Sequence, residues 1–464
     1  MNSISPTTKK TLLALLAVAM LPVLFFAQRG LEGERERLGV TMSAELQNAP
    51  PLLAFITAAG GGFRGVVANV LWIRANQLQQ DERYFELYTL SDWITKLQPE
   101  FSQVWAVQAW NMAWNISVKF TEPADRWLWV RSGMELLRDE GLRYNPHDPL
   151  LHRELAWIFQ DKIGKYTDLA HKHYKQQWIT EMLGVLGTNA RPDMLIHPQT
   201  DDARRRAYML REKYKLDPAW MKQVDEHYGP FDWRMPESHA IYWADLGLSR
   251  CKGSAFDMQS LRRVIWQTMQ AAFLRGRLIE HPDRRVDFGP NLDMIPNANR
   301  AFEEMKQSEP DKRDYISGAQ KNFLKDAIYH LYTNSRQREA AYWFNYTRTN
   351  FSDVIPAGHD LDQFVVAGIT SELRDANPSR VRSMLEGMIG HYLRARAYGE
   401  DDAANGYALL ARRVWEFYSV KRAGQANVQM ASLPEIEQDV RARLFPPAVP
   451  PARNSTTNNP TPTP

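Results

Sequence analysis

Four histidines that lie close together in the chain are the first candidates for chemistry, because clustered histidines can bind a metal ion. They are His147, His152, His171 and His173. Helices that bind zinc place two ligands four residues apart on one face, whereas His171 and His173 are two residues apart and point to different faces. The chain also lacks an HExxH pattern. The sequence therefore predicts packed or surface histidines, with no metal ion and no cofactor.

Glu154 and Asp161 are the second candidates, because residues seven positions apart on a helix return to nearly the same face. Two carboxylates on one face suit the acid and base steps of glycan cleavage. The same spacing is common on amphipathic helices, where carboxylates are solvated or ion-paired. No GxSxG or Walker motif occurs, and Gly60–Gly62 lacks the Lys and Ser or Thr of a phosphate loop. We therefore expect no enzyme; a helical envelope enzyme acting on glycan or peptide substrates is the alternative.

The charged residues and the single cysteine exclude further kinds of site. Lys and Arg number 57 against 54 Asp and Glu, a net charge of +3, and the basic residues are dispersed along the chain. Nucleic-acid binding usually needs a basic block, so no nucleic acid is expected. The short run Arg204–Arg206 follows two aspartates and is typical of a solvated helix face. Cys251 alone can form neither an internal disulfide nor a CxxC metal motif.

Helices must position all of these residues, because apolar side chains recur at helical spacing. The clearest runs are Trp127, Val130, Met134 and Leu137, and then Leu151, Leu155 and Phe159. Prolines fall between such segments, at Pro99, Pro123, Pro146 and Pro149, where they end or begin helices. The sequence predicts an all-α fold. Its 464 residues exceed the roughly 250–300 at which one core stops growing, so two helical units or one extended array are expected.

The apolar run Thr11–Ala27 has the composition of a membrane segment. Its 17 residues are at the short end of the range that crosses a ~30 Å hydrocarbon layer, and the apolar region of a signal peptide shares these features. The small-x-small cleavage signal at Ala17–Ala19 would leave Leu21–Phe26 exposed at the new terminus. We therefore favour a retained, single-pass membrane anchor. The flanking basic residues are nearly balanced, and we place the large domain outside the cytoplasm because short N-terminal tails usually stay inside.

Turn-forming residues and changes in composition divide the chain into segments. The predicted boundaries are an N-terminal tail at 1–10, the transmembrane anchor at 11–27, a stalk and hinge at 28–65, a repeat-like helical domain at 66–183, a turn-rich joint at 184–236, a second helical region at 237–445 and a tail at 446–464. The last segment consists largely of Pro, Asn and Thr, which cannot form a core, and is expected to be disordered.

A recurring pattern of large and small side chains indicates a helical repeat. The pattern occurs at Leu71, Ala75 and Leu78, then 34 residues later at Trp105, Ala109 and Met112, and 47 residues after that at His152, Ala156 and Phe159. Pro99 and Pro146 each lie six residues before the first member of the second and third sets. Small residues are needed where stacked helices approach closely, so the pattern predicts successive antiparallel helix pairs.

This pattern resembles the tetratricopeptide repeat, in which pairs of antiparallel helices stack into a superhelix. Trp105, Ala109, Met112, Gly141 and Pro146 match the large, small and proline positions of the family, with 13 extra residues inserted. The resemblance covers roughly residues 66–180, with a fainter trace at 323–351. It implies a concave groove, lined by the first helix of each pair, that binds a peptide or a partner protein.

The resemblance also implies which residues line this groove. They are Gln103, Ala106, Trp110, Ala113 and Trp114 in one repeat, and Leu150, Arg153, Trp157, Gln160 and Asp161 in the next. The tryptophans and the polar residues of this set are predicted to bind the partner, because such side chains suit binding hot spots. The alternative is that the tryptophans form an ordinary core between repeats. The sequence predicts a membrane-anchored scaffold or adaptor that binds a protein or peptide partner at the cell envelope, and leaves the partner and the oligomeric state open.

Overall fold

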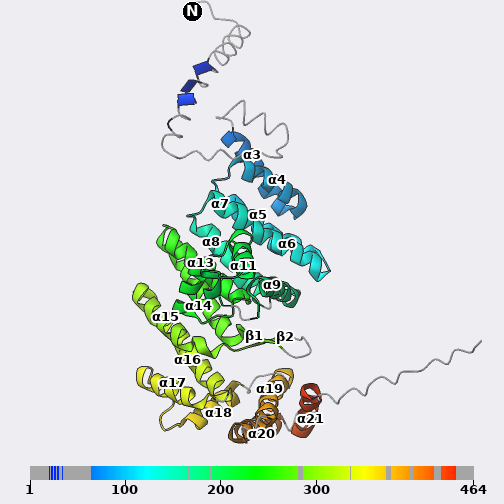
Figure 1. Cartoon of the computed structure of the whole chain (residues 1–464), viewed down its shortest axis with the longest axis vertical. Helices are drawn as coiled ribbons and strands as arrows, with labels where there is room; N and C mark the ends of the chain where they lie inside the picture. Colours follow the sequence, from blue (N-terminus) through cyan, green and yellow to red (C-terminus); the bar gives the residue numbers. More distant parts are fainter. Residues whose placement is uncertain are drawn as a thin grey trace, which may run out of the picture. The chain divides into compact units, whose positions relative to one another are not determined.

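Helices account for most of the chain that the computed structural model describes. The described residues are 64–165, 167–188, 191–280, 286–334, 336–372, 378–397, 401–422 and 430–445, with a few single residues between Met20 and Glu34. The secondary-structure content is 80% helix and 1% strand. The predicted all-α fold is therefore confirmed (Figure 1).

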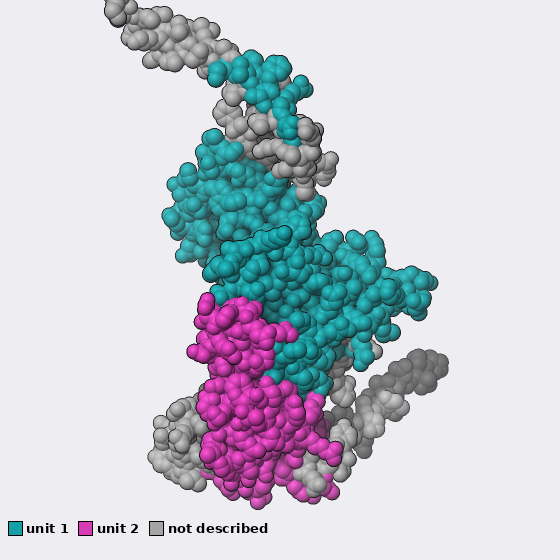
Figure 2. All heavy atoms as spheres, turned by 90° about the vertical axis from the view of Figure 1, so that its left-hand side faces the viewer, with its two compact units in different colours: residues 1–301 teal, residues 302–464 magenta. Residues whose placement is uncertain are grey.

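The chain divides into two compact units, residues 1–301 and 302–464 (Figure 2). The helices of unit 1 are α3 (Arg64–Gln80), α4 (Tyr84–Leu97), α5 (Ser102–Trp110), α6 (Pro123–Glu135), α7 (Leu142–Tyr144), α8 (Pro149–Trp157), α9 (His171–Leu186), α10 (Asp193–Ile196), α11 (Asp201–Glu212), α12 (Pro218–Tyr228), α13 (Pro236–Arg250) and α14 (Ala255–Arg275). The division falls within α15 (Ile295–Ser308). Unit 2 continues with α16 (Arg313–Thr333), α17 (Gln337–Asn350), α18 (Leu361–Glu372), α19 (Pro378–Ala397), α20 (Asp401–Arg422) and α21 (Leu433–Leu444).

Local sequence determines where several helices begin. Proline stands at the start of α6, α8, α12 and α13, where its missing N–H sacrifices no helical hydrogen bond. Before the proline of α8, the carboxylate of Asp148 accepts a hydrogen bond from the N–H of Leu150 at 2.8 Å. The prediction that Pro123 and Pro149 bound helices is confirmed.

Three helices of unit 1 continue into π-helical turns, whose hydrogen bonds span five residues rather than four. The turns are η1 (Asn111–Ile116) after α5, η3 (Leu136–Gly141) after α6 and η4 (Ile158–Ile163) after α8. The turns η1 and η4 contact each other. Because π turns occur frequently at functional sites, the region around η1 and η4 is a candidate functional site.

One hydrogen bond recurs at the start of three helices of unit 1. The fourth residue of α5, α8 and α13 is aromatic, and a ring nitrogen of each bonds to the backbone carbonyl six residues earlier. The pairs are Trp105 with Pro99 at 2.7 Å, His152 with Pro146 at 3.1 Å and His239 with Trp233 at 2.8 Å. Burial lowers the pKa of His239 to about 4 and also lowers that of His152. Both histidines are therefore neutral core residues whose Nε2–H groups donate to the carbonyls.

Glycines lie where helices of unit 1 pack closely. A Cβ on Gly141 would meet Trp105 on α5 at 3.4 Å and Leu151 on α8 at 3.3 Å. A Cβ on Gly247 of α13 would lie only 2.7 Å from the Cβ of His152 on α8. The contacts between α8 and α13 join the predicted repeat domain (66–183) directly to the predicted second helical region (237–445), within one compact unit.

The described chain contains one short antiparallel sheet. Strand β1 (Arg277–Glu280) pairs with β2 (Val286–Gly289), and Arg277 lies opposite Gly289. The N–H of Leu278 donates to the carboxylate of Asp232 at 3.3 Å, which attaches the hairpin to the loop before α13. This two-stranded sheet is small enough to leave the predicted all-α class unchanged.

The predicted membrane anchor at 11–27 lies largely outside the residues that the structure describes. The same is true of the tails at 1–10 and 446–464 and of most of the stalk at 28–65. Across the described residues, no helix combines the length and the apolar composition that crossing a bilayer requires. The anchor therefore stays a prediction from the sequence.

Candidate functional site

Three tryptophans predicted to line the groove lie together in unit 1. The rings of Trp110 and Trp114 stack with centroids 6.0 Å apart and planes 16° apart, and Trp114 meets Trp157 at 5.3 Å. All three side chains are half-buried, so each keeps part of its surface open. We term these three residues the tryptophan ladder.

Two neighbouring helices and their π turns position the ladder. Trp110 is the last residue of α5, and Trp114 follows four residues later in η1, about one turn onward, so that the two rings stack. Trp157 ends α8, immediately before η4. Because α5 contacts α8 and η1 contacts η4, the ladder lies where the two π turns meet.

A buried cluster of charges adjoins the ladder through Lys162, whose Nζ lies 5.9 Å from the ring centroid of Trp114. Asp168 accepts hydrogen bonds from Arg126 at 2.9 Å, from Lys162 at 2.5 Å and from the N–H of Ala170 at 2.8 Å. The Lys162 and Asp168 side chains are only 3% and 5% exposed. Burial is tolerated because each charge has a partner.

The pKa values in this cluster indicate a positioning role. Burial lowers the pKa of Lys162, and the hydrogen bond to Asp168 opposes that shift. Burial alone would raise the pKa of Asp168, but the hydrogen bonds from Lys162 and Ala170 and the nearby positive charges lower it. Burial raises the pKa of Tyr174, whose hydroxyl accepts a hydrogen bond from Arg126, to about 12. Each ionisable group forms hydrogen bonds or ion pairs with other members of the cluster, so the cluster fixes the position of η4.

Three of the positions implied for the groove lie in the interior instead. Gln160 is 5% exposed, and its amide donates to the carbonyl of Val264 at 3.2 Å and to the hydroxyl of Thr268 at 3.0 Å, both on α14. Ala106 and Ala113 are buried as well. These side chains offer almost no surface to a partner, and Gln160 joins η4 to α14 rather than lining a groove.

The remaining polar groove residues are accessible to different degrees. Gln103 is exposed on α5, whereas Arg153 and Asp161 are half-buried. Arg153 forms an ion pair with the buried carboxylate of Glu154, and Asp161 pairs with Lys165 at 2.9 Å. Burial raises the pKa of Glu154, although Arg153 opposes the shift. Both carboxylates considered for catalysis are thus engaged by cations next to them on the same stretch of chain.

The four histidines are dispersed among different contacts. His152 is a core residue, and Nδ1 of His147 lies 3.2 Å from the carbonyl of Arg250. His171 and His173 are half-buried near the start of α9. Over the part of the chain that the structure describes, no group of three or more His, Cys, Asp or Glu side chains is placed to hold a metal ion.

A second aromatic cluster escaped the sequence analysis. Its members are Phe85 and Tyr88 on α4, Phe120, and Trp129 on α6, with ring centroids 5.5 to 6.3 Å apart. Phe85 is 52% exposed, and Trp129 is half-buried. Only the i, i+3 spacing of Phe85 and Tyr88 was visible in the sequence, because the other contacts depend on how α4 packs with the segments around it.

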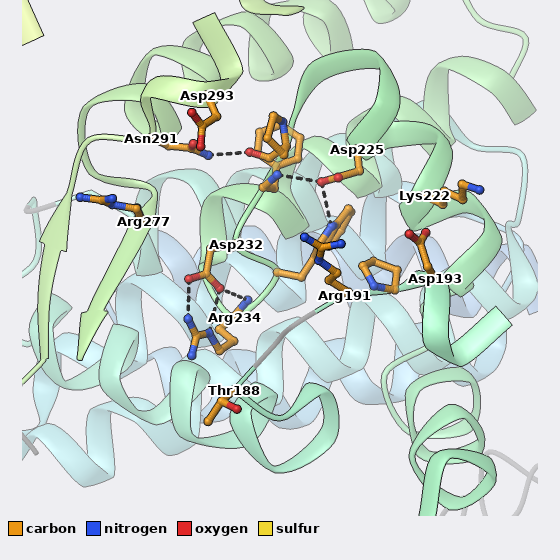
Figure 3. Close-up of a pocket in the computed structure, with 14 residues that line it drawn as sticks. Thr188, Arg191, Asp193, Lys222, Asp225, Asp232, Arg234, Arg277, Asn291 and Asp293 are labelled. Carbon is orange, nitrogen blue, oxygen red and sulfur yellow. Dashed lines mark hydrogen bonds and ion pairs between the residues drawn. The ribbon is translucent and has the colours of Figure 1, made fainter. Parts of the chain in front are cut away.

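A charged pocket of about 510 Å³ also opens in unit 1, and sequence analysis missed it. Its residues come from the segment after α9, the start of α10, the middle of α12, the loop before α13, β1 and the segment after β2 (Figure 3). Four basic and four acidic side chains line it: Arg191, Lys222, Arg234 and Arg277, and Asp193, Asp225, Asp232 and Asp293. Much of the pocket lies in the segment 184–236, which the sequence predicts as a joint.

The fold and these two surfaces define an all-α protein with a half-open aromatic surface and a separate charged pocket in unit 1. No protein-family model, characterised protein or solved structure matches the chain. The function must therefore follow from the residues of the two surfaces.

Proposed function

We propose that this protein is a helical-repeat scaffold or adaptor that binds a protein or peptide partner through the tryptophan ladder. The ladder carries the proposal, because three large aromatic side chains from two helices contact one another and yet remain half-buried. Tryptophans of this kind dominate binding hot spots, since they bury a large area while keeping a polar N–H. Gln103, Arg153 and Asp161 would supply a polar rim around the aromatic centre. This composition suits a peptide or helix with apolar side chains between polar ones.

The packing of unit 1 supports a tetratricopeptide-like arrangement of its helices. Helix α3 packs on α4, α5 with η1 packs on α6, and α5 packs on α8. Ala109 and Ala156 are fully buried, and Gly141 lets η3 approach both α5 and α8. The ring-to-carbonyl hydrogen bond that opens α5, α8 and α13 is a further local feature that stacked helix pairs would repeat.

The proposal includes a membrane tether on sequence grounds. The apolar run 11–27 would hold the helical units at a bilayer, outside the cytoplasm. The rival function, a helical enzyme acting on envelope glycans or peptides, draws less support, because Glu154 and Asp161 already pair with Arg153 and Lys165.

Replacing Trp110 by Ala is expected to weaken partner binding by about 2 kcal/mol or more, a factor of about 30. The substitution removes one outer ring of the ladder and its stacking on Trp114. The measurement is affinity capture of the full chain from detergent-solubilised membranes after mild cross-linking, with the captured proteins quantified by mass spectrometry.

Trp129→Ala is the matched control, because it also removes a half-buried tryptophan from an aromatic cluster of unit 1. Both variants should keep the helical circular-dichroism spectrum of the unaltered protein, and only Trp110→Ala should lose the partner. Equal loss in both variants, or full capture by Trp110→Ala, would count against the ladder as the binding surface.

A further inference from the structure

Helix α3 carries apolar side chains on two opposite faces. Ala68 and Ala75 are buried on one face, and α4 is the main packing partner of α3 (Figure 1). On the other face, Val66, Val70 and Ile73 recur at i, i+4 and i+7, so they lie in one row along the helix. We term these three residues the α3 stripe. Because α4 covers only one face, the stripe needs a second apolar surface to remove it from water.

The side chains of the α3 stripe are largely open to solvent. Val66 is 58% exposed, Val70 is 60% exposed and Ile73 is 63% exposed. In the described helices from α4 onward, exposed large apolar side chains occur at most twice in one helix, and Phe256 and Leu274 of α14 lie at opposite ends of it. Single exposed apolar side chains are ordinary on protein surfaces, whereas a continuous row of them marks a contact surface.

The charge of α3 favours a particular kind of contact. The helix contains Arg64 and Arg74 and no acidic residue. The guanidinium of Arg74 donates to the side chain of Gln77 at 3.3 Å and forms no ion pair within the described part of the chain. Two copies of the protein pairing through their stripes would bring like charges together, with no carboxylate on either helix to offset them. An anionic lipid surface would instead attract the arginines and accept the apolar side chains.

The predicted membrane anchor at 11–27 would bring α3 close to such a surface. Helix α3 is the first helix with described bounds after the anchor. Residues 28–63 connect the two, and a chain can span up to roughly 3.3 Å per residue, so the connection allows α3 to reach the bilayer. A tether raises the effective concentration of lipid at the stripe. Three side chains that would bind a membrane weakly on their own can therefore stay bound.

We propose that the α3 stripe lies against the surface of an anionic membrane, with Val66, Val70 and Ile73 inserted at the boundary between lipid headgroups and acyl chains. This inference rests on the membrane tether of the proposed function. It adds a second contact, which would fix the orientation of the first helix pair, α3 and α4, on the bilayer. The tryptophan ladder contributes no residue to the stripe, so the two surfaces can act at the same time.

A fluorescent label on the stripe tests this contact. The full chain with Val70→Cys is labelled with the dye NBD and reconstituted into vesicles of phosphatidylcholine and phosphatidylglycerol. Cys251 is buried, and burial raises the pKa of its thiol to about 11, so it reacts slowly at neutral pH. We expect the label to lose most of its fluorescence when brominated lipids replace the ordinary ones, because bromine on the acyl chains quenches only dyes at the bilayer. Phe256→Cys on α14, where the native side chain is 68% exposed, is the control and should keep its fluorescence.

Charge placed within the stripe should abolish the lipid contact. In a chain labelled at Val66→Cys, the substitutions Val70→Asp and Ile73→Asp should remove the quenching, because a carboxylate is repelled by anionic lipid and is costly to bury. Both native side chains are exposed, so the fold should be retained. The matched control is Asn76→Asp with Gln79→Asp, which adds the same charge at exposed positions of α3 outside the stripe. The control should leave the quenching in place.

Three results would overturn the inference. The first is the absence of lipid quenching at both labelled stripe positions. The second is shielding of the label from aqueous iodide without lipid quenching, because a protein surface would then cover the stripe. The third is equal loss of quenching in the two aspartate pairs, because charge alone would then decide the contact.

Extraction with alkaline carbonate measures the anchor separately. A chain that is extracted from the vesicles contradicts the tether of the proposed function. A chain that resists extraction and yet shows no quenching at the stripe contradicts this inference alone.

Discussion

Asp168→Ala is expected to lower the free energy of unfolding by about 3–5 kcal/mol. The substitution removes the shared partner of Lys162 and Arg126, whose side chains are only 3% and 11% exposed. Two buried cations would then face each other without a counter-charge, and the N–H of Ala170 would lose its acceptor. Urea denaturation followed by tryptophan fluorescence measures the effect.

Asp161→Ala is the control for this substitution, because it breaks a second Asp–Lys pair on the same segment. Lys165 is 38% exposed, so water can replace the lost partner and the cost should stay below about 1 kcal/mol. Equal losses in the two variants would contradict a buried, mutually dependent cluster. The lowered pKa of Asp168 gives the effect a pH signature: its stabilisation is present above the unfolded-state pKa of about 3.9 and is lost as the pH falls through the lowered pKa.

Gly247→Leu is expected to destabilise the protein by about 3 kcal/mol or more. A Cβ at this position would lie 2.7 Å from the Cβ of His152 and 3.2 Å from Cδ1 of Leu261. The extra atoms of leucine have no space between α8, α13 and α14, so the helices must separate. Thermal or urea unfolding would report the loss.

Gly184→Leu is the matched control for the helix packing. Gly184 is exposed within α9, and a Cβ there would meet no atom within 4 Å. Leucine has a higher helix propensity than glycine, so this variant should gain about 0.5–1 kcal/mol. A neutral outcome for Gly247→Leu would show that α13 does not pack closely on α8.

The fold class was predictable because its determinants are local. Apolar residues at helical spacing and prolines at helix starts specify α6 and α8 directly, and Pro123 and Pro149 stand where the sequence places them. The packing of α13 on α8 was not predictable, because it depends on a contact between His152 and Gly247, which lie far apart in the chain. No periodicity within one segment reports such a contact.

The candidate site was predictable to a lesser extent. Trp110 and Trp114 lie four residues apart, so their stacking follows from helical geometry. Gln160 was misplaced because the prediction continued an α-helical register through the residue, whereas the chain enters the π turn η4 at Ile158, which rotates the later side chains. The ion pair between Arg126 and Asp168, 42 residues apart, depends on tertiary packing and leaves no local pattern.

Trp110 of the tryptophan ladder lies on the same face of α5 as Gln103, which is seven residues earlier and exposed. A photoreactive amino acid placed at Gln103 therefore reports whether a partner covers the ladder in living cells. Tyr208, which is 67% exposed on α11, is the control position on the same unit.

We predict one dominant cross-linked adduct from position 103, no equivalent adduct from position 208, and loss of the adduct when Trp110 is also replaced by Ala. The absence of any adduct from position 103, or an adduct that persists without Trp110, would contradict the central claim that the ladder binds a protein or peptide partner.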